Sequence, residues 1–332
     1  MDAFSQVILI FLLFYLLGKT AEVLVSDISI VSRKMGIPIV FFGLILGFFT
    51  SFPELGIAIN AFISNVQDIS MGNLLGGPLV MLGLIFGVSA ILNKRVHTDG
   101  KFRNVMPIAA YSFLPFLFGM DGVISRLEGT ALMAGYFLLV YAIFLQQKRH
   151  AEGQKTVSFR ERIVLREIFR IAIAIIFILI LSNLIVGFTE GLLKEFHLQG
   201  FLLGIILFAF GTNLPEIIIM FHAWKKGMKD LSMNHLLGSV VVDFLIIGVF
   251  AFLRPITFAV GPGYFNGMLF TALVLVAFVY FYKTDKIFTR LEGSFLFSMY
   301  GIFLLSEQDR SSYSRWRRRS SDNTCLAACQ RG

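Results

Sequence analysis

Two short segments of this 332-residue chain place a proline beside a glutamate inside long apolar runs. The first reads FTSFPEL at 49–55, and the second reads FGTNLPEI at 210–217. A carboxylate such as Glu54 or Glu216 costs roughly 2.5 kcal/mol or more within membrane hydrocarbon, so a matched pair is better explained by function than by packing. The shared pattern is Thr-x-x-Pro-Glu, and it begins at Thr50 and at Thr212.

The two prolines predict helix breaks at membrane depth. Neither Pro53 nor Pro215 has an N–H group to donate to the carbonyl four residues earlier. Backbone oxygens released in this way are tolerated within a membrane only where they line a wet or ion-filled cavity. Ser51 and Asn213 add polar side chains just before the breaks. One Pro-Glu pair alone is equally explained as a kink with a snorkelling acid, but its duplication argues against that.

Carboxylates, hydroxyls and carbonyls together form a set of hard oxygen ligands. Such a set suits Ca²⁺, which takes about 6–8 oxygens in flexible geometry. Two glutamates would cancel the charge of a divalent ion. The two cysteines, Cys325 and Cys329, lie in the terminal tail, and no His cluster accompanies the acids, which disfavours zinc or copper. We expect no cofactor, and treat the cation as transported cargo.

The composition is that of an all-α integral membrane protein. Hydrophobic residues make up 56% of the chain and charged residues 15%, and the mean hydropathy is +0.78. The net charge of +8 does not indicate nucleic acid, because the basic residues are confined to loops and the tail. The bilayer is the expected partner. We predict about ten transmembrane helices from the apolar runs at 4–18, 37–65, 73–92, 105–119, 130–146, 168–189, 200–222, 236–253, 263–282 and 294–305.

The chain also repeats itself. A shift of 162 residues brings the Thr-x-x-Pro-Glu motifs together and also aligns Asp68 with Asp230, while RLEG occurs at both 126–129 and 290–293. Each unit then holds five spans, and because five is odd the second unit enters the membrane from the other side, as in many secondary transporters. The sequence predicts a first repeat at 1–146, a linker at 147–163, an inverted repeat at 164–306, and a polar basic tail at 307–332 that is disordered or foreign to the fold.

Basic residues predict the orientation. Lys and Arg are frequent on the loops that follow odd-numbered spans, whereas the other loops hold only Arg126, Lys194 and Arg254. The positive-inside rule then places the central loop in the cytoplasm and both termini outside, in a prokaryotic inner membrane. The basic tail opposes this arrangement. The first run, preceded by Asp2 and lacking a small-residue cleavage site, reads as a retained helix.

These segments resemble a known family. GTNLPE followed by DLSMNHLLGSVVVDFLIIG at 230–248, and TSFPE followed by DISMGNLLGGPLVMLGLIFG at 68–87, are similar to the two alpha-repeats of sodium/calcium exchangers of bacterial or archaeal type, in the cation/calcium antiporter superfamily. The resemblance implies broken second and seventh helices around one ion site. It implies Glu54 and Glu216 as principal calcium ligands, oxygens from Thr50 and Thr212, nearby carbonyls of Gly47 and Ala209, sodium-holding positions at Ser51 and Ser239, and a polar position at Asp243.

The chain departs from that family pattern at several polar positions. Gly77, Pro78 and Met81 replace polar residues of the first repeat, while Val240 replaces an Asn and Asn213 a Ser in the second. Several sodium ligands are therefore altered while the calcium pair remains, which leaves the counter-ion open between Na⁺ and H⁺.

Two further polar positions have competing interpretations. His235 stands where the first repeat has Asn73, and is interpreted as a hydrogen-bonded interfacial residue, with proton coupling as the alternative. Asp68 and Asp230 are interpreted as helix caps, with cation attraction at the site entrance as the alternative.

The sequence thus predicts a transporter and not an enzyme: a secondary antiporter that exchanges Ca²⁺ for Na⁺ or H⁺ by alternating access. The gate helices are expected at 4–32 and 164–192. The alternatives are an H⁺-coupled cation exchanger, a cation channel, and an intramembrane enzyme, for which no catalytic motif is evident. The oligomeric state is left open.

Overall fold

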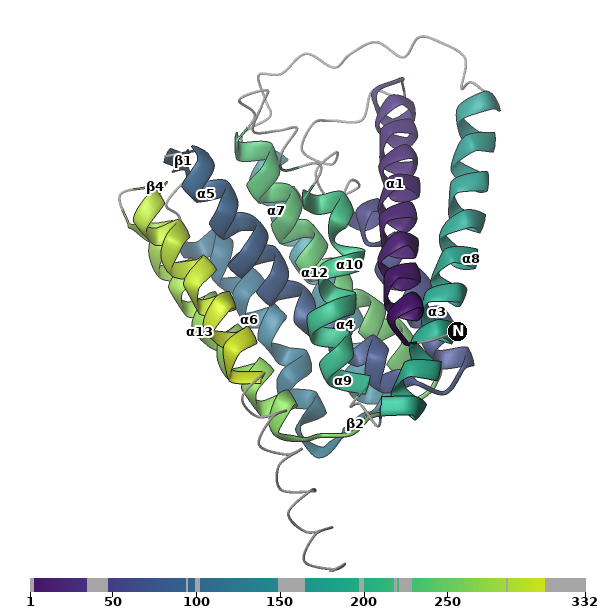
Figure 1. Ribbon diagram of the computed structural model, residues 1–332. Helices are drawn as coiled ribbons and strands as arrows, with labels where there is room; N and C mark the ends of the chain where they lie inside the picture. Colours follow the sequence, from purple (N-terminus) through teal and green to yellow (C-terminus); the bar gives the residue numbers. More distant parts are fainter. Residues whose placement is uncertain are drawn as a thin grey trace, which may run out of the picture.

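The computed structural model describes residues 3–34, 47–93, 95–98, 102–148, 165–196, 200–217, 220, 229–284 and 286–307. Almost all of this chain is helical, as predicted for an all-α protein (Figure 1). Nearly all of the predicted linker and tail lies outside the described residues, and so do the side chains of Asp230 and His222.

The first half of the chain contains seven helical elements and two short strands besides a helical turn at 47–50. In order they are α1 (Ala3–Lys34), α3 (Phe52–Ile63), α4 (Gln67–Pro78), the π-helical η1 (Leu79–Phe86), α5 (Gly87–Asn93), β1 (Arg95–His97), α6 (Phe102–Phe118), the 3₁₀ turn η2 (Gly119–Asp121), β2 (Val123–Ile124) and α7 (Arg126–Lys148).

The second half follows the same order. It contains α8 (Leu165–Phe196), α9 (Gly200–Leu203), the π-helical η3 (Gly204–Phe208), α10 (Ala209–Thr212), α12 (Lys229–Leu253), β3 (Ile256–Thr257), α13 (Pro262–Lys283) and β4 (Ile287–Thr289), with further helix at 214–217 and 290–307.

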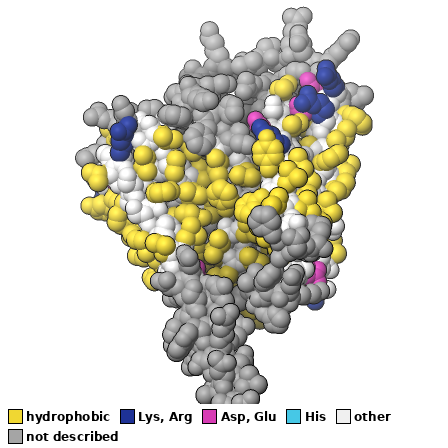
Figure 2. Space-filling model, in the orientation of Figure 1, with side chains coloured by type: hydrophobic (Ala, Val, Ile, Leu, Met, Phe, Trp, Pro, Cys, Tyr) yellow, Lys and Arg dark blue, Asp and Glu magenta, His cyan; other side chains and the backbone are white. Residues whose placement is uncertain are grey.

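Five described helices are long and apolar enough to cross a membrane: Ser5–Leu24, Gln67–Asn93, Arg166–Leu193, His235–Leu253 and Pro262–Lys283. Three shorter apolar helices cover Phe52–Ile63, Val105–Asp121 and Gly200–Thr212. The prediction of ten spans is therefore supported only in part by helix length and composition. Figure 2 shows hydrophobic side chains across the middle of one face, with most of the visible Lys and Arg near its upper edge.

The repeated RLEG motif has a local structural cause. Each copy follows a Ser or Thr and forms a capping box, in which the glutamate accepts a hydrogen bond from the backbone N–H of the residue before the helix. The distances are 2.8 Å from Ser125 N to Glu128 Oε2 and 2.7 Å from Thr289 N to Glu292 Oε2. The motif therefore fixes the start of the last helix in each half.

Short antiparallel strands connect the two halves. Strand β1 pairs with β4, with Val96 opposite Phe288, and β2 pairs with β3, with Ile124 opposite Ile256. The β1–β4 pair lies at one end of the bundle and β2 lies at the other (Figure 1).

Asp68 does not cap a helix. The cap residue of α4 is Val66, and no side chain hydrogen-bonds to the free N–H groups there. Asp68 instead lies in the first turn, where its Oδ1 accepts a hydrogen bond from the backbone N–H of Ala259 at 2.8 Å. The predicted cap is therefore wrong. The carboxylate ties α4 to the segment after β3.

The apolar interior consists of two separate clusters. One contains most buried residues of α1 and α8 together with Ile57, Ile69 and Phe208, and the other joins the remaining helices. The predicted gate helices correspond to α1 and α8, which pack chiefly against each other at one side of the bundle (Figure 1). Neighbouring residues of α3, Ile57 and Ala58, belong to different clusters, so this helix lies between the two.

One ion pair joins the two gate helices. Arg170 Nε of α8 lies 3.1 Å from Asp27 Oδ2 of α1, where the aspartate side chain is 1% exposed and the arginine side chain 46%. A buried charge that loses its partner is costly, whereas a half-exposed charge can be solvated. The two members should therefore respond differently to mutation.

We expect Arg170→Gln to destabilise the protein more than Asp27→Asn, by on the order of 2–3 kcal/mol once exposure of the arginine is allowed for. The double variant should recover most of that loss, because it removes the unpaired buried charge. Thermal unfolding in detergent measures the effect. Lys19→Gln, which breaks an exposed pair with Glu22, should change little. Equal losses in both single variants would contradict this account.

Candidate cation-binding site

The two Thr-x-x-Pro-Glu motifs interrupt their helices at matching residues. Ser51 separates the helical turn at 47–50 from α3, and Asn213 separates α10 from the helix at 214–217. Their backbone angles are nearly the same, with φ −80° and ψ 12° at Ser51 and φ −84° and ψ 11° at Asn213. Pro53 lies in the first turn of α3, where its missing N–H costs nothing. The predicted breaks are present.

Polar side chains before each break bond back to the preceding turn. The carbonyl of Gly47 accepts hydrogen bonds from Thr50 Oγ1 at 3.0 Å and Ser51 Oγ at 3.2 Å. The carbonyl of Ala209 accepts one from Asn213 Nδ2 at 2.7 Å. The two carbonyls expected near the ion therefore already stabilise the interrupted helix ends.

Each threonine also reaches into the other half of the chain. Thr50 Oγ1 lies 3.1 Å from His235 Nε2 and 3.1 Å from Ser239 Oγ, both on α12. Thr212 Oγ1 lies 3.1 Å from Asn73 Oδ1 on α4. A shift of 162 residues turns Thr50 into Thr212 and Asn73 into His235. The Thr50–His235 and Thr212–Asn73 contacts are therefore two copies of one interaction.

Three buried carboxylates approach one another at this crossing. The side chains of Glu54, Glu216 and Asp243 are each 0% exposed. The Glu54 carboxylate interacts electrostatically with the other two acids and lies by the hydroxyl of Thr212, while Glu216 lies by that of Thr50 and Asp243 by that of Ser51. No hydrogen bond of normal geometry reaches any of their carboxylate oxygens from the described residues.

Asp243 occupies space that a glycine leaves open. A Cβ atom on Gly77 would lie 2.2 Å from Asp243 Oδ2, which is far inside contact distance, and 3.9 Å from Met81 Cε. The carboxylate therefore packs directly against the α4 backbone. Gly77 and Met81, at which this chain departs from the family pattern, form the wall that faces this acid.

Unpartnered oxygens of this kind fit a hard cation. Buried carboxylates need a charge partner, and neither ion pair of the described residues includes these three acids. In the part of the chain that the structure describes, no three His, Cys, Asp or Glu side chains form a group that could hold a metal by themselves. Hydroxyl and amide oxygens from Thr50, Thr212 and Asn213 would have to complete the set, as Ca²⁺ coordination commonly requires.

The structure brings the predicted polar residues together, and it adds two. Thr50, Ser51, Glu54, Thr212, Asn213, Glu216, Ser239 and Asp243 are all buried around the crossing. His235 is 1% exposed and bonded to Thr50, so its interpretation as an interfacial residue is wrong. Asn73 joins it on the opposite side. The 162-residue shift, which aligns Asn73 with His235, is the sequence signal that could have found both.

Comparison with known proteins agrees with this arrangement. The chain matches the family described as "Sodium/calcium exchanger protein" over residues 5–145 and 167–306. It is 27% identical over 251 residues to inner membrane protein YrbG of Escherichia coli, covering 71% of this chain and 76% of that one. It is 25% identical over 331 residues to sodium/calcium exchanger MaX1 of Methanosarcina acetivorans, covering 87% and 94%.

Two solved structures share the fold. The sodium-calcium exchanger NCX_Mj superimposes with a TM-score of 0.65 at 19% identity, covering 90% of this chain and 98% of that one. The H⁺/Ca²⁺ exchanger CAX superimposes with a TM-score of 0.73 at 18% identity, covering 92% and 82%. The fold and the site thus define a membrane exchanger. The chain belongs to the sodium/calcium exchanger family.

The contact between Gly77 and Asp243 generates a test. In Gly77→Ala the new methyl group would overlap the Asp243 carboxylate, which must then move away from the other acids. We expect Ca²⁺ binding, measured by isothermal titration on purified protein, to weaken by at least about tenfold, equivalent to 1.4 kcal/mol. Gly301→Ala is the matched control, because no atom lies within 4 Å of a Cβ built there. Unchanged affinity in Gly77→Ala would remove Asp243 from the site.

Proposed function

We propose that this protein is a secondary active antiporter that exchanges Ca²⁺ for Na⁺ or H⁺ across a membrane by alternating access. The observation that carries the proposal is the burial of Glu54 and Glu216, each beside the threonine of the other half and each without a hydrogen bond to its carboxylate among the described residues. Two such carboxylates match the charge of one Ca²⁺ ion, with Asp243 as a third acidic group.

Inverted repeats are part of the same proposal. The Thr50–His235 and Thr212–Asn73 contacts exchange under the 162-residue shift, and the β1–β4 and β2–β3 pairs correspond in the same way. Because the two strand pairs lie at opposite ends of the bundle, the operation that relates the halves reverses their direction (Figure 1). This supports two five-helix units in opposite orientations, and about ten spans in all.

Alternating access would use α1 and α8 as the moving part. These helices share a cluster of apolar side chains that is distinct from the rest of the interior. Their displacement relative to the bundle would open the site first to one side and then to the other. An empty site with several uncompensated acids should cross only reluctantly, which couples the two ions. The orientation proposed from basic residues places the loop after α7 in the cytoplasm.

The relatives leave two candidate counter-ions. MaX1 is named a sodium/calcium exchanger, and the CAX structure is that of an H⁺/Ca²⁺ exchanger. In this chain Gly77, Pro78 and Met81 offer no side-chain oxygen on the wall beside Asp243. Sites for a monovalent ion are therefore reduced on that side, whereas the oxygens around Glu54 and Glu216 are retained.

The central test is ⁴⁵Ca uptake into proteoliposomes under an imposed Na⁺ or H⁺ gradient. We expect Glu54→Gln and Glu216→Gln each to lower gradient-driven uptake by at least about tenfold, because each removes a charged ligand and leaves an amide of the same shape. Glu22→Gln, at a partly exposed glutamate of α1, is the control and should transport normally.

Two outcomes would overturn the assignment. Normal uptake in both glutamine variants would show that these acids do not bind the cargo. Uptake that is independent of any counter-ion gradient, together with single-channel currents, would identify a cation channel instead.

The wall beside Asp243 gives a separate prediction. Met81→Asn introduces an amide oxygen next to the carboxylate, so Ca²⁺ uptake should depend more strongly on a Na⁺ gradient than in the unaltered protein. The measurement is uptake at stepped Na⁺ gradients with the H⁺ gradient held at zero. Met81→Leu keeps the apolar wall and serves as the control. Equal Na⁺ dependence in all three proteins would show that this wall does not govern the counter-ion.

A further inference from the structure

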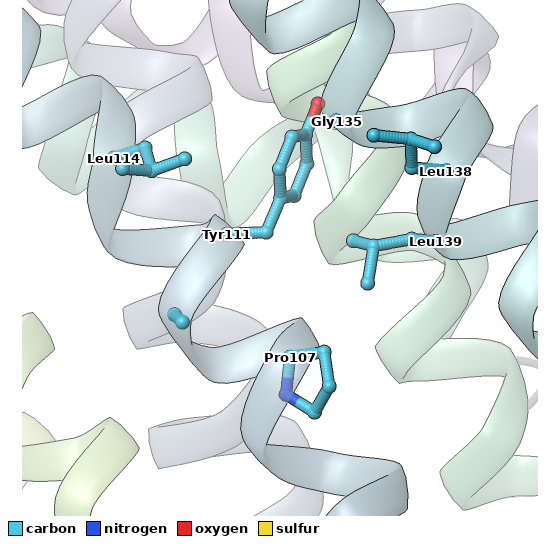
Figure 3. A pocket seen from close by; sticks show the side chains of 7 residues that line it. Pro107, Tyr111, Leu114, Gly135, Leu138 and Leu139 are labelled. Atoms are coloured by element: carbon cyan, nitrogen blue, oxygen red, sulfur yellow. The ribbon is translucent and has the colours of Figure 1, made fainter.

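A shallow groove lies between α6 and α7, away from the carboxylates. Its volume is about 320 Å³. Pro107, Tyr111 and Leu114 line it from α6, and Gly135, Leu138 and Leu139 line it from α7. Figure 3 shows these side chains around an open space, with the Tyr111 ring directed toward Gly135.

The groove follows from the residue types at the helix contact. A Cβ on Gly135 would lie 2.8 Å from Cε2 of the Tyr111 ring, so only glycine lets the ring lie this close to α7. The Tyr111 hydroxyl donates a hydrogen bond to the carbonyl of Leu132 at 2.9 Å. Since its polar end is satisfied, the tyrosine presents only its ring to the open space. The remaining lining side chains are apolar.

We propose that this groove binds one hydrocarbon chain of a membrane lipid. The surface that continues from it is apolar, with Leu138 67% exposed, Phe137 60% and Leu117 44%, and in a membrane such a surface faces lipid. An unfilled groove would forfeit dispersion contacts along its whole wall. The α6 part of the lining runs from Pro107 to Leu114, about 10 Å of helix, and offers no free polar group that would select a headgroup.

A second copy of the protein suits the groove less well. A helix with its side chains is about 10–12 Å wide, whereas the cavity holds about 320 Å³ in total. A flexible chain can follow the groove between Tyr111 and Leu138, while a helix could only lie across its mouth.

The groove also adjoins the helix that carries part of the ion site. The Tyr111 ring meets the ring of Phe244 edge-on, with centroids 6.1 Å apart, and Phe244 is the residue after Asp243 on α12. A chain in the groove would therefore contact a side chain that packs beside the third carboxylate. This inference does not depend on the proposed transport activity.

The test uses tryptophan quenching by a brominated lipid. The two native tryptophans, Trp224 and Trp316, are replaced by Phe, and Leu138→Trp places a single fluorophore on the groove wall. Purified protein in detergent is titrated with phosphatidylcholine carrying dibrominated acyl chains. We expect saturable quenching near one lipid per protein. Half-saturation should need at least about tenfold less lipid than for Val276→Trp, a control on α13 at a residue 69% exposed outside the groove.

A blocking variant makes the outcome decisive. Ala110→Phe adds a ring to the α6 wall and should abolish the saturable quenching at Leu138→Trp. If Leu138→Trp and Val276→Trp respond alike, or if Ala110→Phe has no effect, the groove does not bind a lipid chain. A fluorescence change that follows protein concentration without added lipid would assign the groove to a second copy, and would overturn the proposal.

Discussion

Burying three carboxylates in an apolar bundle is the constraint on which the rest of the structure depends. Glu54, Glu216 and Asp243 have no exposure to solvent, and no described basic residue pairs with them. Such charges are tolerated inside a protein only where an opposite charge or well-placed dipoles compensate them. A passing cation supplies that compensation. The surrounding polar groups are arranged around its place, since Thr50, Ser51, Thr212 and Asn213 are held by bonds to their own helix ends.

The crosswise arrangement follows from the duplication. Each Thr-x-x-Pro-Glu motif contributes its glutamate to the vicinity of the threonine of the other motif. Neither half can build this environment alone, because the hydroxyl and the carboxylate of one motif are separated by the helix break. The capping boxes at Ser125 and Thr289 and the strand pairs at the two ends of the bundle connect the halves outside the site.

Sequence reasoning found the acids because burying a carboxylate is costly, and because the duplicated Pro-Glu pairs are visible without any structure. The helix breaks and the gate helices were predictable for the same reason, since proline chemistry and long apolar runs are local properties. His235 was misjudged because its role depends on Thr50, 185 residues away. Asp68 was misjudged because its partner is a backbone N–H in a distant loop. The contact of Gly77 with Asp243 depends on the packing of two helices, which no local pattern records.

The division of the apolar interior has a consequence for how force passes through the protein. Ile57 and Phe208 face the cluster of α1 and α8, while their chain neighbours Ala58 and Ala209 face the other cluster. The elements that carry the acids thus form a seam between two greasy masses. Sliding along such a seam exchanges one apolar contact for another and exposes no backbone amide, so it meets little enthalpic resistance. A cation held by ligands from α3 and from α12 would act as a removable cross-link within that seam, stiffening it while bound and freeing it on release.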